Sequence, residues 1–189
     1  MQPGARVALT AGSREICCID EILRSAAAFL KQLGAQPFIV PAMGSHGGAT
    51  AEGQTELLAG YHITEETCGC PILSSMETVF LGKTADGQDV FLDRYAAEAD
   101  GILVIGRVKA HTGFQGPYES GILKMLAIGL GKQKGADSCH SKGFGRMAEN
   151  IQQFGFAILK YAKVVGALAI LENAFDQTYR LAGMAPEEI

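Results

Sequence analysis

Short apolar runs alternate with segments of helical pattern along this chain, and this alternation limits the fold more than any other feature. The runs lie at residues 6–10, 36–41, 101–108 and 164–171. The third, Gly-Ile-Leu-Val-Ile-Gly-Arg-Val, is apolar on both faces except at Arg107, which is typical of a parallel strand covered by helices on both sides. Segments between the runs repeat apolar residues at helical spacing, most clearly over 19–33 and 146–163. We therefore predict an α/β fold with a Rossmann-like, mainly parallel sheet flanked by helices.

Other segments add detail to this fold. Residues 77–81 and 89–92 are predicted to form a hairpin, and residues 120–130 a helix that ends at Gly131. Thr50 is a plausible N-cap for a helix that runs to Leu58. The last five residues, Ala-Pro-Glu-Glu-Ile, are typical of the start of a helix. We therefore expect residues 1–189 to be one domain of a larger protein.

Composition excludes several classes of protein. The formal net charge is −4 and no block of Lys or Arg occurs, which argues against nucleic-acid binding. No apolar run approaches the roughly 20 residues of a membrane span, and residues 1–4 do not resemble a signal peptide. The five cysteines are odd in number and irregularly spaced, so we expect reduced thiols. These observations predict a cytoplasmic protein without a membrane partner.

His46 lies in a glycine-rich segment, Met-Gly-Ser-His-Gly-Gly-Ala-Thr (residues 43–50), between a predicted strand and a predicted helix. Glycines allow a ligand to approach the backbone, and free N–H groups at a helix start favour an anion. A phosphate or carboxylate beside the imidazole is therefore one interpretation. A tight turn with an exposed histidine is the other, and this segment does not decide between them.

Two more residues stand out between positions 107 and 131. His111 follows an apolar strand in Val-Lys-Ala-His-Thr-Gly-Phe, where crowded titratable groups indicate either a site or a solvated strand end. Lys124 is the single charged residue between Gly121 and Gly131. Loss of hydration would lower the pKa of its amine and make it nucleophilic. Taken alone, the residues favour the alternative, a lysine whose stem extends to water.

His140 lies in Gly-Ala-Asp-Ser-Cys-His-Ser (residues 135–141). A neutral imidazole commonly binds a metal. A solvated loop histidine is the interpretation that this segment favours by itself.

Four segments together resemble the nickel-dependent lactate racemase family. They are MGSHGGAT, VKAHTGF, ESGILKMLAIGLGKQ and DSCHSKGFG, and they occur in the order found in that family. The resemblance spans most of the chain and is closer to a broad, mostly uncharacterised branch than to the lactate enzyme itself. It implies an N-terminal catalytic α/β domain of a two-domain protein, whose C-terminal domain is missing from this chain. It leaves open whether the protein forms a homo-oligomer.

The resemblance also implies a chemistry. Family members use a nickel pincer cofactor built on a pyridinium mononucleotide, and Lys124 would be its covalent attachment point. His140 would be the protein ligand to nickel. His46 and His111 would act as alternate general base and acid on opposite sides of a small-molecule 2-hydroxy acid. The implied reaction is racemisation or epimerisation by reversible hydride transfer to the cofactor, and we expect this fragment to be inactive alone.

Further residues are expected to hold the cofactor or the substrate. Arg14 matches the arginine of the family's Asp-x-x-Arg motif, although Ala11 stands where the aspartate is expected. Gly47, Gly48 and Thr50, at the glycine turn and the helix start, would help to hold a phosphate or carboxylate.

Two other functions remain as alternatives. His46, His111 and His140 could bind a metal in a hydrolase. The glycine-rich segments could instead form a non-enzymatic binding domain for a phosphorylated small molecule.

Overall fold

A five-stranded sheet forms the centre of the chain, which a computed structural model describes at residues 2–110, 113, 115–141 and 143–189. The strands of both sheets are β1 (Arg6–Ala11), β2 (Gln36–Pro41), β3 (Thr78–Lys83), β4 (Asp89–Asp93), β5 (Gly101–Arg107), β6 (Val164–Glu172) and β7 (Thr178–Met184). The helices are α1 (Ile19–Gln32), α2 (Ala51–Gly60), α3 (Glu65–Cys68), α4 (Arg94–Glu98), α5 (Ile122–Lys124), α6 (Lys132–His140) and α7 (Met147–Tyr161). Shorter helical turns are η1 (Gly47–Ala49), η2 (Met125–Gly129), η3 (Phe144–Arg146) and η4 (Pro186–Glu188).

The strand order of the central sheet is β2-β1-β5-β6-β7. The first four strands pair in parallel, and β7 pairs antiparallel with β6. This confirms the predicted mainly parallel α/β fold. The chain proceeds from β1 outward to β2 and then returns to place β5 on the other side of β1. The order of the sheet therefore reverses between β1 and β5, which is where open α/β sheets commonly bind ligands.

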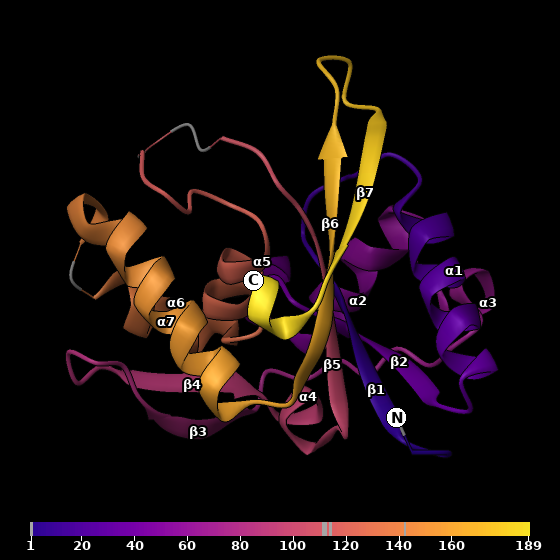
Figure 1. The fold of residues 1–189 in the computed structure, drawn as a ribbon, viewed down its shortest axis with the longest axis horizontal. Helices are drawn as coiled ribbons and strands as arrows, with labels where there is room; N and C mark the ends of the chain where they lie inside the picture. The colour runs from indigo at the N-terminus through magenta and orange to yellow at the C-terminus, as the bar shows by residue number, and fades with distance from the viewer. Residues whose placement is uncertain (1, 111–112, 114, 142) are drawn as a thin grey trace.

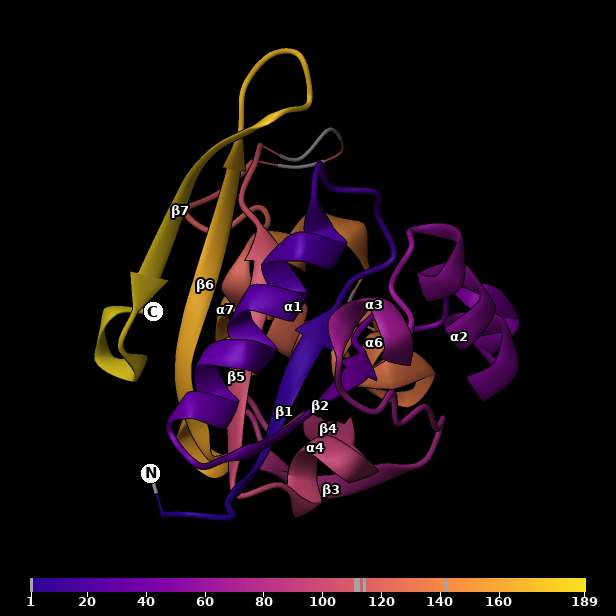
Figure 2. The same ribbon diagram turned by 90° about the vertical axis from the view of Figure 1, so that its right-hand side faces the viewer.

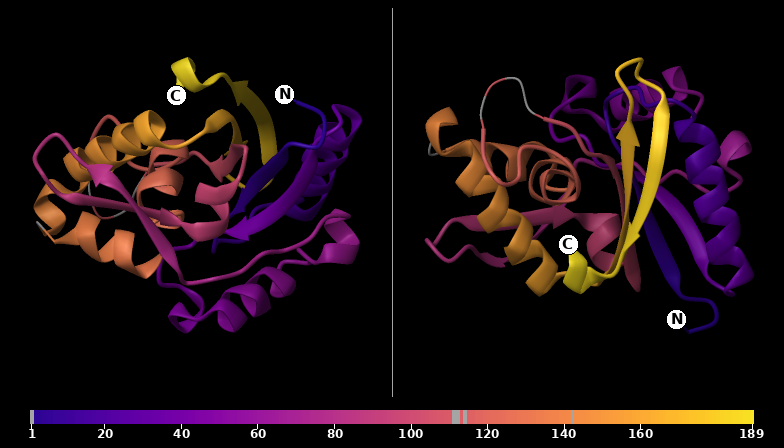
Figure 3. Two further views of the ribbon diagram at one scale, coloured as in Figure 1. Left: turned by 90° about the horizontal axis from the view of Figure 1, so that it is seen from below. Right: turned by 45° about the horizontal axis from the view of Figure 1, so that its top comes forward.

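Helices cover both faces of this sheet (Figures 1 and 2). α1 lies on one face, where it packs against a cluster that includes Val7, Leu9 and Ile105. The other face carries α5, α6 and α7, with Val104 and Phe154 in its core. The separate β3–β4 ribbon lies on this second side, as the view from below shows (Figure 3). Alternate residues of the central strands thus pack into two cores, one on each face of the sheet, which explains why these strands are mostly apolar.

Three elements differ from the sequence predictions. Residues 120–130 form a three-residue helix, α5, followed by the π-helical turn η2, and not one regular helix. His140 is the last residue of helix α6, whereas the sequence by itself favoured a loop position. At the C-terminus, Pro186–Glu188 form only a 3-10 turn after an unpredicted strand, β7. Among the described residues, no helix is both long enough and apolar enough to cross a membrane.

Candidate functional site

A cavity of about 620 Å³ opens at the carboxyl ends of β1, β2 and β5, at the point where the strand order reverses. Its walls come from the loops after these strands, from α5 and η2, and from the ends of α6 and α7. The lining residues are Gly12, Ser13, Arg14, Ile16, Ala42, Met43, His46, Arg107, Lys109, Ala110, Ser120, Gly121, Lys124, Met125, Ile128, Gly129, His140 and Met147.

Four of the predicted site residues line this cavity: Arg14, His46, Lys124 and His140. They come from four segments that are distant in sequence, and the sheet topology brings them together. His111 lies outside the described residues, although Lys109 and Ala110, just before it, line the cavity. The remaining predictions, Gly47, Gly48 and Thr50, are not lining residues.

His46 is held by the loop that follows β1. Its Nδ1 atom is hydrogen-bonded to Ser13 Oγ, and Tyr61 Oη donates to the Ser13 carbonyl oxygen at 3.0 Å. Burial lowers the pKa of His46, and the positive charges of Arg14 and Lys124 lower it further. The imidazole is therefore mainly neutral at pH 7 and able to accept a proton.

Lys124 is half-buried at the junction of α5 and the π-helical turn η2. Burial lowers the pKa of its amine, and Arg14 and Lys109 add electrostatic repulsion. A lowered pKa increases the fraction of uncharged, nucleophilic amine. Single π-helical turns are frequent at functional sites. The sequence did not predict this turn, because its residues have the apolar pattern of an ordinary helix.

The turn η2 lies directly against the end of β2. The Gly44 N–H donates to the Gly129 carbonyl oxygen at 3.1 Å, which joins the Lys124 segment to the His46 loop. A Cβ atom at Gly129 would lie 2.6 Å from the Ala42 carbonyl oxygen. The two segments therefore approach this closely only because position 129 has no side chain.

We expect Gly129→Ala to lower the free energy of unfolding by roughly 1–3 kcal/mol, because the added methyl group must displace backbone atoms. The matched control is Gly60→Ala in α2, where a Cβ would have no neighbour within 4 Å. Urea unfolding of both variants measures the difference. Equal stabilities would contradict the close approach of η2 to β2.

The glycine turn after His46 has a structural role in this arrangement. Gly47 has a φ of 66°, and a Cβ there would lie 2.6 Å from the backbone of Gly53. Thr50 is the N-cap of α2, as predicted, and accepts from the Gly53 N–H at 3.0 Å. These residues pack α2 against the turn that carries His46.

A buried polar cluster formed by Lys132, Asp93 and Gln54 was not predicted from the sequence. All three side chains are completely buried. Lys132 Nζ lies 3.3 Å from Asp93 Oδ2 and donates to Gln54 Oε1 at 2.9 Å and to the Pro41 carbonyl oxygen at 2.5 Å. Gln54 Nε2 in turn donates to the carbonyl oxygens of Gly44, at 2.9 Å, and His46, at 3.2 Å. The cluster thus fixes the end of β2 and the loop that carries His46.

The charge around the cavity is positive. Arg14, Arg107, Lys109 and Lys124 contribute cations, and no Asp or Glu is found among the described lining residues. Arg107 Nη1 lies 2.6 Å from Glu172 Oε2, and this ion pair compensates the charge of Arg107. Such a cavity attracts an anion such as a carboxylate or phosphate. In the described part of the chain, no group of three or more His, Cys, Asp or Glu side chains is arranged to hold a metal ion.

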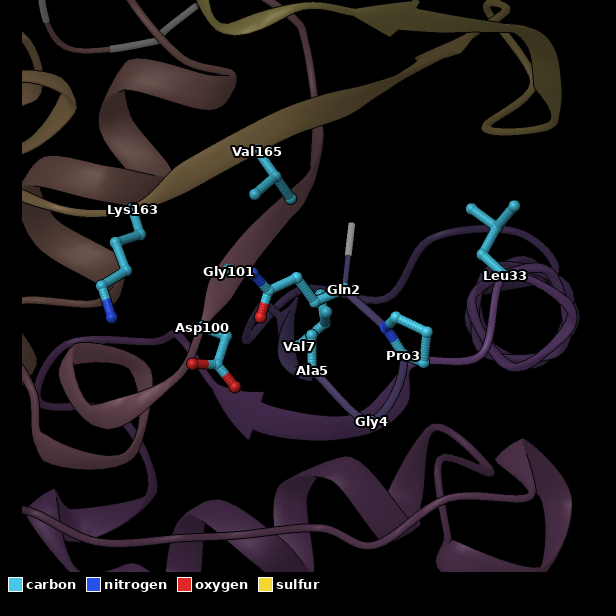
Figure 4. Close-up of a pocket in the computed structure, with 10 residues that line it drawn as sticks. All are labelled: Gln2, Pro3, Gly4, Ala5, Val7, Leu33, Asp100, Gly101, Lys163 and Val165. Atoms are coloured by element: carbon cyan, nitrogen blue, oxygen red, sulfur yellow. The ribbon is translucent and has the colours of Figure 1, made fainter.

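A second cavity, of about 720 Å³, lies at the opposite end of the sheet (Figure 4). Its two charged lining residues are already used by the backbone: Asp100 Oδ2 accepts from the Arg6 N–H at 2.9 Å, and Lys163 Nζ donates to the Ala99 carbonyl oxygen at 3.4 Å. It also lies at the amino ends of the strands, away from the usual ligand position in α/β sheets. We therefore place the functional site in the smaller cavity.

Comparison with known proteins gives a consistent result. The sequence model of the lactate racemase N-terminal domain family matches residues 12–151, a range that contains every residue lining the site cavity. No curated protein matches the chain in sequence. The structure of the lactate racemase apoprotein from Thermoanaerobacterium thermosaccharolyticum has a similar fold, with a TM-score of 0.67 and 14% identity. The similarity covers 98% of this chain and 46% of that chain, so this chain spans about half of its length. Because the family match covers most of the chain and all of the cavity, the chain belongs to the lactate racemase N-terminal domain family.

Proposed function

We propose that this chain is the N-terminal catalytic domain of a racemase or epimerase that acts on a small 2-hydroxy acid. The observation that carries the proposal is the meeting of His46, Lys124 and His140 in one cavity at the reversal point of the sheet. Since the chain spans about half of the similar structure, we propose that a second, C-terminal domain completes the active protein.

In this proposal the cavity would hold a nickel pincer cofactor built on a pyridinium mononucleotide. Lys124, with its lowered pKa, would be the attachment point, and His140 would be the ligand to nickel. A cofactor that brings its own metal donors needs few from the protein, and this agrees with the donor set of the described residues. The chemistry that the group supplies when bound is the reversible acceptance of a hydride.

The side chains of this domain would bind the substrate and move its hydroxyl proton. Arg14 would attract the carboxylate of the hydroxy acid. His46 would accept the 2-hydroxyl proton through Nε2, since Ser13 engages its Nδ1 atom. His111 would serve as the second acid–base group for the opposite enantiomer. Water would be excluded by the apolar lining, including Met125 and Ile128.

The pKa of His46 gives a prediction that needs no cofactor. Because Arg14 contributes to lowering this pKa, Arg14→Gln should raise it toward its ordinary value. Titration of the His46 imidazole by NMR measures the change, with Arg24→Gln on the exposed side of α1 as the control. In activity assays, the acidic limb of the pH profile should move to higher pH, since the neutral base then forms at higher pH. An unchanged His46 titration would show that Arg14 does not face this imidazole.

Interconversion of enantiomers tests the proposed reaction. The complete protein, coexpressed with the enzymes that make the cofactor, would be incubated with single enantiomers of several 2-hydroxy acids and analysed by chiral chromatography. We expect at least one acid to racemise or epimerise, with a rate lowered about 10²- to 10⁴-fold by His46→Gln. Cofactor-loaded protein that interconverts no 2-hydroxy acid would contradict the proposal.

The positive cavity also favours one alternative, a binding domain for a phosphorylated small molecule. Binding of such a ligand should then survive replacement of both His111 and Lys124 by alanine, as measured by calorimetry. The racemase proposal expects these replacements to abolish catalysis.

A further inference from the structure

Two adjacent cysteines lie at the start of α1, beyond the loop that forms one edge of the cavity. The Sγ atoms of Cys17 and Cys18 are 3.4 Å apart and within hydrogen-bonding distance. Cys18 is exposed and Cys17 is half-buried, so reagents in solution can reach the pair. Neither thiol lines the cavity, and the proposed reaction does not use them.

The other three cysteines are in a different environment. Cys68, Cys70 and Cys139 are all buried. Burial raises the pKa of Cys70 to about 11 and that of Cys139 to about 12. The thiolate is the reactive form of cysteine, so these buried thiols are poor nucleophiles. Accessible thiol chemistry among the described cysteines is therefore concentrated at positions 17 and 18.

The backbone of Cys17 is anchored on both sides to the β6–β7 hairpin. Its N–H donates to Glu172 Oε1 at 3.2 Å, and its carbonyl oxygen accepts from Thr178 Oγ1 at 2.8 Å. Glu172 is itself fixed by its ion pair with Arg107. These contacts come from segments more than 150 residues away in sequence, and they fix the backbone of Cys17 in the folded state.

Cys17 also influences the ionisation of Cys18. The pKa of Cys18 is raised, chiefly by its hydrogen bond with Cys17 and then by the charge of Cys17. The sulfur atoms of the two residues lie within contact distance of each other. This is the arrangement that thiol–disulfide exchange needs: one attacking thiolate and one resolving thiol.

We propose that Cys17 and Cys18 form a redox-active dithiol that closes to a vicinal disulfide by exchange with a low-molecular-weight disulfide such as oxidised glutathione. One thiolate attacks the oxidant, forms a mixed disulfide and releases one glutathione thiolate. The second cysteine, after losing its proton, attacks the protein sulfur of this mixed disulfide and releases the second glutathione. The two cysteines lose two electrons and two protons, and the oxidant is reduced to two thiols.

Closing the ring requires the two side chains and the peptide unit between them to adjust. The sulfur atoms must move from 3.4 Å to the bond length of about 2.05 Å, which side-chain rotation can supply in part. Adjacent residues are closer than the usual Cα separation of a disulfide, so the product is strained and readily reduced. A reversible bond of this kind suits a reducing compartment, where disulfides are mostly transient.

Peptide mapping provides a direct test, because trypsin isolates the pair. Cleavage after Arg14 and Arg24 releases residues 15–24, which contain only these two cysteines. The protein would be treated with mixtures of oxidised and reduced glutathione, quenched in acid, alkylated and digested. We expect the wild-type peptide to lose two hydrogens and to carry no glutathione, with reversal by excess reduced glutathione. The peptides that carry the other three cysteines should stay reduced.

Single replacements separate ring closure from simple exposure of a thiol. Cys17→Ser and Cys18→Ser each remove the resolving partner, so each should retain one glutathione in a stable mixed disulfide. The thermal unfolding of each variant would first be matched to that of the wild type. A wild-type peptide that retains glutathione would overturn the proposal, and so would one that remains reduced in every mixture. The test needs neither nickel nor substrate and is therefore independent of the proposed function.

Discussion

Replacing Lys124 by alanine in the complete protein should abolish cofactor attachment and catalysis together. Among the described residues that line the cavity, Lys124 is the only half-buried lysine. Burial lowers the pKa of its amine, and the neighbouring cations Arg14 and Lys109 lower it further. If the cofactor is tethered through this amine, the variant cannot retain it. We expect the rate of racemisation to fall to background, a loss of at least about 10⁴-fold, because the cofactor carries the difficult chemistry.

Two further variants separate tethering from charge. Lys124→Arg keeps the positive charge but replaces the lysine amine with a guanidinium group. It should therefore be as inactive as the alanine variant. Lys109→Ala removes a neighbouring cation and should still carry the covalent adduct. Nickel content and intact mass measure both outcomes. An active Lys124→Arg variant would contradict a covalent role for this lysine.

Replacing Lys132 by methionine should lower the stability of the protein more than Gly129→Ala or Lys83→Met does. The change leaves the completely buried Asp93 without its cation, and it removes the hydrogen bonds to Gln54 and Pro41. Breaking one side of a buried ion pair typically costs 3–5 kcal/mol, and we expect a loss of about that size. At roughly 2–4 °C for each kcal/mol, the midpoint of thermal unfolding should fall by about 6–20 °C.

An exposed pair and a double variant serve as controls for Lys132. Lys83→Met breaks the ion pair with Asp89, whose side chains are 59% and 48% exposed, and it should cost less than about 1 kcal/mol. Combining Lys132→Met with Asp93→Asn removes the uncompensated charge and should recover part of the stability. Equal losses for Lys132→Met and Lys83→Met would contradict the buried cluster.

The central strands could be predicted from the sequence because each is apolar over most of its length. β1, β2, β5 and β6 have two covered faces, so their residues carry a strong local signal. β7 was missed because it is an edge strand whose residues are largely exposed, and its sequence mixes polar and apolar side chains. The π-helical turn η2 was missed because its geometry depends on the close approach of Gly129 to β2, a contact between distant segments.

The candidate site, too, could be predicted from the sequence only where it does not depend on contacts between distant segments. His46, Lys124 and His140 were singled out from their sequence segments, and the family resemblance added Arg14 and the roles of all four. The structure places all four at one cavity, while their chemical roles stay predictions. Lys132 was not selected, since it lies in a polar segment that looks exposed. Its burial depends on Asp93, Gln54 and Pro41, which only the tertiary structure brings to it. Local sequence could not indicate this buried charge.

Site-resolved mass spectrometry of the complete, cofactor-loaded protein tests whether Lys124 is the attachment point of the cofactor. Proteolysis would isolate the peptide that contains Lys124, and its mass would be compared with that from protein made without the cofactor enzymes. We expect an added mass on Lys124 itself, together with bound nickel that is lost in His140→Ala. An unmodified Lys124 in a nickel-containing, active protein would contradict this expectation.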